Sequence, residues 1–180
     1  MEVQTLTTAR LELQPQTIAH ADRLFDCFQD GELYPFITRT PPESRDEFRK
    51  AILFLEGRKS RDGSQYWLNW VSIHRQSGEL VGKVEVTMDI ATRDVHLAYY
   101  TFRKHWKQGY ARESCLGVIT HLFQHYATQR VVIEMDVRNT ASVKLAESLG
   151  AKRTAHNPKV QMLKGEWSDE YQYELLATFG

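Results

Sequence analysis

The stretch that decides the fold runs from residue 99 to residue 112 and reads YYTFRKHWKQGYAR. A strand ends in it, a short loop with one glycine, Gly109, follows, and a helix starts at once at the small Ala111. This order directs backbone N–H groups and the positive end of a helix toward one place, which is how proteins bind anions. Lys107 and Arg112 add positive charge at the rim. The stretch predicts an anion site, although a glycine that merely eases the turn is an equally good explanation.

The segments on either side of this stretch predict a sheet. Alternating apolar and polar residues indicate three strands joined by hairpin-length turns. These strands cover residues 66–75, 80–90 and 95–102. After the turn, apolar residues at helical spacing predict a helix over 111–126, and an alternating run predicts a strand over 131–137.

The N-terminal part predicts one strand and two helices. An alternating strand over 9–15 ends at its proline. One helix follows Thr17, and a second begins at Ser44, where Glu47 completes a capping box that satisfies otherwise free backbone donors.

The C-terminal part predicts a short helix and two strands. Asn139 opens the helix and Gly150 closes it, and the strands cover 160–163 and 171–177. The predicted order is β-α-α-β-β-β-α-β-α-β-β, a mixed, mostly antiparallel α/β (α+β) sheet flanked by helices rather than a doubly wound parallel one. Neither a repeat nor a linker composition divides the chain, so residues 1–180 are predicted to form a single domain.

The charge balance narrows the possible partners. The chain has 180 residues, and 23 Lys and Arg minus 23 Asp and Glu leaves a formal net charge of 0. A protein that binds nucleic acid through its phosphates needs a basic surplus, so no nucleic-acid partner is expected. No apolar run approaches the roughly 20 residues of a membrane-spanning helix, and no signal peptide is recognised. With Cys27 and Cys115 as its two cysteines, the chain fits a reducing compartment, and a cytoplasmic location is predicted.

Four segments together resemble one family. Residues 106–111, WKQGYA, resemble motif A of the GNAT (GCN5-related) N-acetyltransferases, whose pattern is Gln/Arg-x-x-Gly-x-Gly/Ala. Three further segments are similar to the ribosomal-protein-serine/alanine acetyltransferase subgroup, namely 8–13, 139–142 with 149–151, and 167–175. The resemblance covers nearly the whole chain and implies a single GNAT-like N-acetyltransferase domain.

The resemblance implies acetyl-CoA as co-substrate and assigns the residues that bind it. The pantetheine arm would bond the strand formed by Tyr99, Tyr100 and Thr101, and Asn139 would also contact it, although Asn139 is an equally good helix cap. The pyrophosphate would lie on backbone N–H groups of Lys107, Gln108, Gly109, Tyr110, Ala111 and Arg112. Trp106 stands where motif A usually has Gln or Arg, and Lys107 replaces a glycine common in the subgroup.

The implied reaction is attack of an amine on a thioester, which needs a neutral amine and hence a proton acceptor. Glu134 is the first candidate, because some relatives carry their base five residues before the Asn. His96 is the second, because the subgroup often has Glu there and histidine titrates near neutral pH. Glu85 is the third. The structural alternative for each is a polar residue on a strand face, solvent-exposed for Glu134 and Glu85.

The donor of a proton to the departing thiolate is less clear. Many relatives have Tyr seven residues after the Asn, where this chain has Ala146. Ser142, which is otherwise a routine first-turn residue, is the remaining candidate. A thiol pKa of about 8.5 also makes a protein donor dispensable.

Other polar residues have structural explanations. Cys27 and Cys115 lie on apolar helix faces and are expected in the core, which argues against a cysteine nucleophile. His121 and His125 are spaced i, i+4, but no third ligand accompanies them, so solvated helix residues are predicted and no metal is expected.

The leading hypothesis is an acetyl-CoA-dependent N-acetyltransferase that transfers its acetyl group directly to a primary amine in a ternary complex. The alternative is a non-catalytic acyl-CoA-binding or regulatory module on the same fold. The acceptor, either a small molecule or a protein N-terminus, and the oligomeric state stay open, a homodimer being common in such relatives. The loop at residues 34–36, Tyr-Pro-Phe, is predicted to help choose the acceptor.

Overall fold

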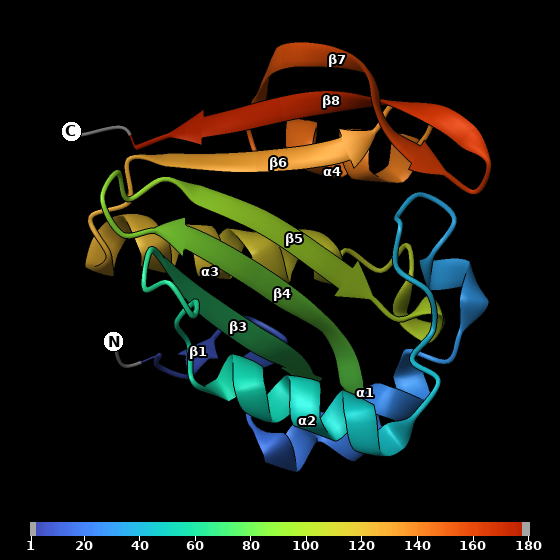
Figure 1. Ribbon diagram of the computed structural model, residues 1–180. Coiled ribbons are helices and arrows are strands. Elements are labelled where there is room, and N and C mark those ends of the chain that lie inside the picture. The colour runs from blue at the N-terminus through green and yellow to red at the C-terminus, as the bar shows by residue number, and fades with distance from the viewer. Residues whose placement is uncertain (1–2, 178–180) are drawn as a thin grey trace.

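Eight strands form one sheet in the computed structural model, which describes residues 3–177 (Figure 1). The spatial order is β1-β2-β3-β4-β5-β6-β8-β7. The strands are β1 (Leu6–Thr7), β2 (Leu11–Pro15), β3 (Gln65–His74), β4 (Leu80–Asp89), β5 (Val95–Thr101), β6 (Arg130–Asp136), β7 (Lys152–Leu163) and β8 (Glu166–Leu176). The predicted fold class and element order are confirmed, with the two-residue β1 added at one edge.

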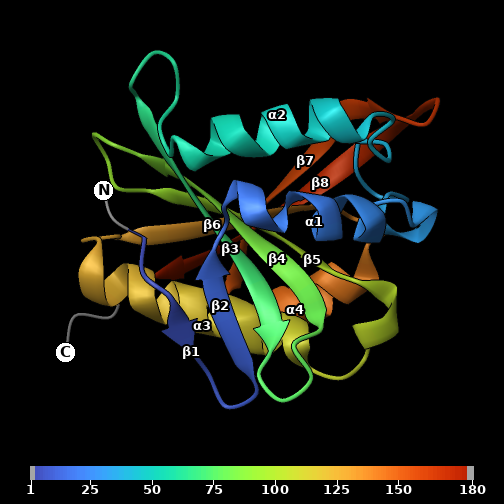
Figure 2. The ribbon, with the colours of Figure 1, turned by 90° about the horizontal axis from the view of Figure 1, so that it is seen from below.

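Two pairs of helices cover the two faces of the sheet (Figures 1 and 2). They are α1 (Ala21–Cys27) and α2 (Arg45–Glu56) on one face, α3 (Tyr110–His125) and α4 (Thr140–Ser148) on the other. Each pair closes its own core: Leu24 and Ile52 pack in the first, Cys115 and Leu122 in the second. The two cores draw on opposite faces of the central strands, so Trp70 of β3 packs in the second core and the next residue, Val71, in the first.

One strand pair differs from the rest of the sheet. All neighbouring strands are antiparallel except β5 and β6, which run parallel and pair only at Val95–Val131 and His96–Val132. Beyond these two pairs the strands diverge, as the ribbons in Figure 1 show. One edge of β5 is therefore left without a neighbouring strand from Leu97 onward.

The last hairpin is longer than predicted. β7 and β8 pair from Lys152–Glu174 to Leu163–Glu166, whereas the predicted strands covered only 160–163 and 171–177. The register shifts between Asn157 and Gln161, a stretch that contains Pro158. A proline and a bulge interrupt the period-two pattern of β7 without ending the ladder, so the pattern revealed only the last four of its 12 residues.

The predicted helix caps are partly confirmed. Ser44 Oγ accepts the backbone N–H of Glu47 at 3.3 Å, but the Glu47 carboxylate contacts Lys50 rather than completing the capping box. Asn139 Oδ1 caps α4 by accepting the N–H of Ser142 at 3.1 Å. The chain after Thr17 begins with a short 3-10 turn before α1.

Candidate active site

The divergence of β5 from β6 creates a row of available backbone groups. Strand β5 still pairs with β4 up to Thr101, so its second edge, facing β6, is the one that opens. Backbone N–H and C=O groups seldom stay unpaired unless water or a ligand satisfies them. Residues 99–101, predicted to bond a pantetheine arm, lie on this open edge, where the Thr101 carbonyl already accepts the Trp106 indole N–H.

The loop after β5 presents a second set of backbone donors. Lys107 and Gly109 have φ of +59° and +80°, so the loop curls tightly into the first turn of α3. Gly109 is the helix N-cap and supplies no capping side chain. Among the described residues, no backbone or side-chain oxygen accepts a hydrogen bond from the amides of 107–112. Free amides and the positive helix end form an anion site. The left-handed conformation of Lys107 explains why glycine is favoured there.

Residues far away in the sequence hold this loop in place. The Arg10 side chain donates to the Gln108 carbonyl at 3.0 Å and to Glu113 at 2.7 Å, and lies over the Tyr110 ring. Thr8 Oγ1 also donates to Glu113, at 2.6 Å. No local pattern in the sequence marks Thr8 or Arg10, because their partners lie about 100 residues downstream.

Two rim residues also act through their side chains. The Trp106 indole donates to the Thr101 carbonyl at 2.6 Å, which fixes the end of β5 against the loop. Arg112 Nε donates to the Ser148 carbonyl at 3.2 Å, which ties α3 to the end of α4. The departure from motif A at Trp106 therefore has a structural role.

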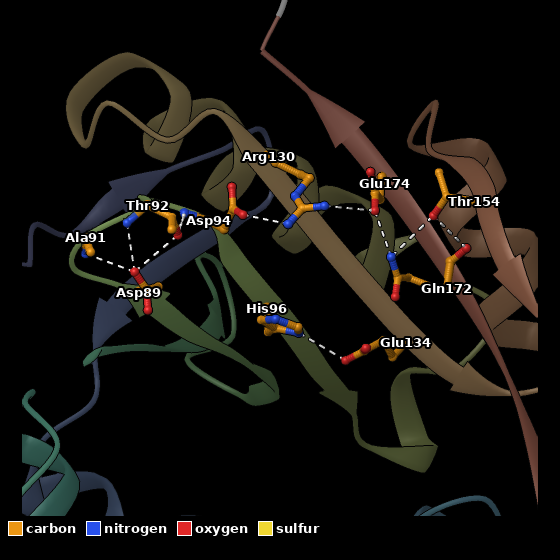
Figure 3. Close-up of polar contacts among 10 residues, drawn as sticks. All are labelled: Asp89, Ala91, Thr92, Asp94, His96, Arg130, Glu134, Thr154, Gln172 and Glu174. Carbon is orange, nitrogen blue, oxygen red and sulfur yellow. Dashed lines mark hydrogen bonds and ion pairs between the residues drawn. The ribbon is translucent and has the colours of Figure 1, made fainter. Parts of the chain in front are cut away.

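Two predicted proton acceptors meet where the strands diverge. His96 Nδ1 lies 3.0 Å from Glu134 Oε2, and Figure 3 shows the two side chains reaching toward each other from β5 and β6. Their hydrogen bond raises the pKa of His96 against the opposing effect of burial, and lowers the pKa of Glu134. The nearby Glu170, which the sequence analysis did not single out, has its pKa raised by burial and by the charge of Glu134.

A salt-bridge network secures the closed end of the same strand pair. Arg130 contacts Asp94 at 2.6 Å and Glu174 at 3.2 Å, and so joins the starts of β5 and β6 to the end of β8 (Figure 3). The two-residue parallel ladder thus begins beside this network and ends at His96, which pairs with Val132 through its backbone and with Glu134 through its side chain.

On the opposite face, a hydroxyl pair lies beside the opening. Tyr99 packs against the core under α3, and its hydroxyl is buried with no partner at hydrogen-bond distance among the described residues. Burial raises the pKa of Tyr99, and the Ser142 hydroxyl partly opposes that rise. The predicted donor Ser142 therefore faces a phenol that the sequence had suggested only as a backbone contact.

The third candidate, Glu85, is not the exposed strand residue that its alternation predicted. It is largely buried, with Lys83 Nζ at 2.7 Å and Arg39 Nη1 at 3.3 Å. Burial alone would raise the pKa of Glu85, but Lys83 and Arg39 outweigh it and the net shift is downward. A carboxylate held by two cations is a poor proton acceptor.

Three further expectations can be compared with the structure. The loop at residues 34–36 stays a predicted contributor to acceptor choice, and within it Tyr34 is 4% exposed and donates its hydroxyl to the Phe28 carbonyl at 2.7 Å. His121 was expected to be solvated but is buried beside Trp70. Cys115 is fully buried in the core, as predicted.

Residues 10–152 match the acetyltransferase (GNAT) domain family. The chain belongs to the GNAT acetyltransferases. The uncharacterized N-acetyltransferase p20 of Bacillus licheniformis is 27% identical over 180 residues, 97% of each chain. Among solved structures, the ribosomal L7/L12 α-N-protein acetyltransferase RimL in complex with coenzyme A has a TM-score of 0.87 at 18% identity, covering 96% of this chain and 98% of that one. Spermidine N-acetyltransferase from Vibrio cholerae, in complex with CoA and spermine, has a TM-score of 0.81 at 18% identity, covering 94% and 97%.

Family membership confirms the predicted class, an N-acetyltransferase with acetyl-CoA as co-substrate. The site of this GNAT protein fits that molecule on three counts: an open β5 edge, free amides at 107–112, and the unpartnered Tyr99 hydroxyl. Between residues 3 and 177, no group of three or more potential metal ligands is present, and no helix is long and apolar enough to span a membrane.

Proposed function

We propose that this chain acetylates a primary amine by direct attack of the amine on the acetyl-CoA thioester in a ternary complex. The observation that carries the proposal is the His96–Glu134 pair at the point where β5 and β6 diverge. Proton-accepting groups lie on one face of the opening and hydroxyl groups on the other. An amine can lose its proton on the first face while the thiolate is stabilised from the second.

His96 is the proton acceptor in this proposal, and Glu134 positions it. When His96 is neutral with its proton on Nδ1, it donates to Glu134, and Nε2 is left with a lone pair for the ammonium proton. Its raised pKa makes His96 a stronger base than an ordinary histidine. Glu134 itself, with its lowered pKa, is the weaker base of the two.

The departing thiolate is stabilised by hydroxyl groups. Tyr99 keeps its proton because burial raises its pKa, so the phenol donates a hydrogen bond. Ser142 lies beside it in the first turn of α4. A covalent acyl-enzyme on cysteine has no support, because Cys115 is fully buried and burial raises the pKa of both Cys115 and the half-buried Cys27.

Backbone groups hold the co-substrate. The amides of Lys107 to Arg112 bind the pyrophosphate, and residues 99–101 bond the pantetheine arm together with Asn139. Acetyl-CoA supplies the activated acetyl group. The cytoplasmic location and the homodimer stay predictions from the sequence.

A thiol-release assay with acetyl-CoA and a panel of amines tests the proposal. The panel contains small-molecule amines, polyamines, amino acids and short peptides with free N-termini. We expect acetyl-CoA to raise the melting temperature, and thiol release to depend on one class of amine. Stabilisation by acetyl-CoA without release on any amine would instead support the non-catalytic acyl-CoA-binding module.

A further inference from the structure

A cationic cluster lies beside the proposed catalytic pair, made of Lys83 from β4 and Arg39 from the loop before α2, both around Glu85. Two positive charges against one carboxylate leave a net charge of +1. The Lys83 side chain is 4% exposed, and Glu85 is the one acceptor recorded for its three N–H donors within residues 3–177. A buried ammonium with so few partners favours a further anion nearby.

Arg39 presents the accessible part of this cluster. Its hydrogen bonds to Glu85 Oε2, at 3.3 Å, and to the Tyr100 hydroxyl, at 3.4 Å, all use Nη1. Within residues 3–177, its Nε and Nη2 groups donate to no acceptor, and 65% of the side chain is exposed. A guanidinium whose Nε and Nη2 donors are free can bind a carboxylate or phosphate through two parallel hydrogen bonds.

The cluster and the catalytic pair share one face of the sheet. In the β4–β5 register, Lys83 lies opposite Tyr100, and Glu85 lies opposite Ala98. His96, Ala98 and Tyr100 alternate onto the same face, so the cluster lies two to four residues along β5 from His96. At about 3.3 Å per residue, the position of His96 on β5 lies roughly 7–13 Å from the positions opposite the cluster. Ala98 lies between the cluster and the catalytic pair on β5 and is small and exposed, so no large side chain of this strand separates them.

We propose that the acceptor of this enzyme is an amine that also carries an anionic group about 7–13 Å from the reacting nitrogen. The amine lies against His96 and the negatively charged Glu134, and the anion binds Arg39 above the positive charge of Lys83. The N-terminus of a peptide with an acidic residue at the second or third position has this length and charge. A polyamine would bring positive charge to Arg39. This inference rests on the proposed function, since it names the substrate class of the same site.

Two tripeptide amides that differ in one charge test the proposal. Ala-Glu-Ala-amide carries the anion, and Ala-Gln-Ala-amide is its neutral counterpart. For the wild-type enzyme we expect kcat/KM to be about tenfold or more higher for the acidic peptide, the usual size of a charged hydrogen bond. In Arg39→Gln the preference should fall below about twofold while turnover of the neutral peptide persists, and Arg39→Lys should keep part of the preference.

A matched control separates a local contact from net charge. Arg45→Gln removes the same charge from an exposed arginine that pairs with Asp22 and Asp26 on the helix surface, and it should keep the full preference. Equal wild-type rates on the two peptides, a preference that survives Arg39→Gln, or an equal loss in Arg45→Gln would each overturn the inference. Turnover of other amines with neither peptide accepted would also overturn it and leave the proposed function intact, whereas no thiol release on any amine would refute the proposed function itself.

Discussion

The co-substrate side and the acceptor side of this site are built in different ways. The co-substrate side comes from one continuous stretch, residues 99–112, and works mainly through backbone groups. The acceptor side is assembled from side chains of β4, β5, β6 and a distant loop, with Arg39, Glu85, His96 and Glu134 as its polar groups. A site built from backbone groups tolerates a side-chain change such as Lys107, whereas the acceptor side should be sensitive to single substitutions. The following experiments test this difference.

The largest effect is expected at His96. We expect His96→Gln to lower kcat by about 10²- to 10³-fold, the usual contribution of a positioned base, with the KM for acetyl-CoA unchanged within about twofold. His156→Gln is the matched control, because His156 pairs with Asp169 at 3.2 Å on the last hairpin, away from the opening. A His96→Gln enzyme as active as that control would exclude His96 as the base.

The second effect concerns pH. The Glu134 hydrogen bond raises the pKa of His96, so in the wild-type enzyme kcat should rise through a pKa above the ordinary 6.5 as His96 loses its proton. Glu134→Gln removes this hydrogen bond, while burial still lowers the pKa of His96. The acid limb of the kcat profile should therefore move to lower pH, and kcat should fall about tenfold. Profiles measured with one acceptor keep the amine's own titration constant. An acid limb that does not move would show that Glu134 does not tune His96.

The third effect tests the backbone site. Gly109 has φ +80°, and an alanine there costs about 1–2 kcal/mol in the left-handed region. We expect Gly109→Ala to raise the KM for acetyl-CoA about tenfold, because the curled loop must change and 1.4 kcal/mol corresponds to a factor of ten. Gly165, at φ +89° in the last hairpin, is the control. Gly165→Ala should lose similar stability without changing KM, and equal KM values in the two variants would contradict an amide-built pyrophosphate site.

The smallest effect is expected at Arg10, which supports the loop without contacting the thioester. Arg10→Ala removes the side-chain bonds to the Gln108 carbonyl and to Glu113, but only the first holds the loop directly, so the KM for acetyl-CoA should rise about threefold, the size of one net hydrogen bond, with kcat unchanged. Arg23→Ala, which removes an exposed arginine bonded to the Gly78 carbonyl, should leave KM unchanged. A fall in kcat with unchanged KM would show that Arg10 does not act by holding the loop.

Features that depend on residues close together in the chain could be predicted from the sequence, whereas features that depend on distant residues could not. The helix at 110–125 and the cap at Asn139 depend on neighbours within a few residues, so periodicity and capping rules predicted them. Glu85 was misassigned because alternation shows which face of a strand a residue takes but not what covers that face. Lys83 is a neighbour on the same strand, but Arg39 reaches Glu85 from 46 residues upstream, and no local pattern shows that contact.

The sequence by itself determined the element order, the family and the strand-loop-helix turn that presents amides to an anion, because each is encoded in contiguous residues. Only the tertiary structure decided that His96 pairs with Glu134 38 residues later, that the Tyr99 hydroxyl is buried without a partner among the described residues, and that Arg10 holds the loop at Gln108. The physical reason lies in the sheet. The two-pair parallel ladder of β5 and β6 sets which side chains face one another at the opening, and its register depends on packing across the whole domain.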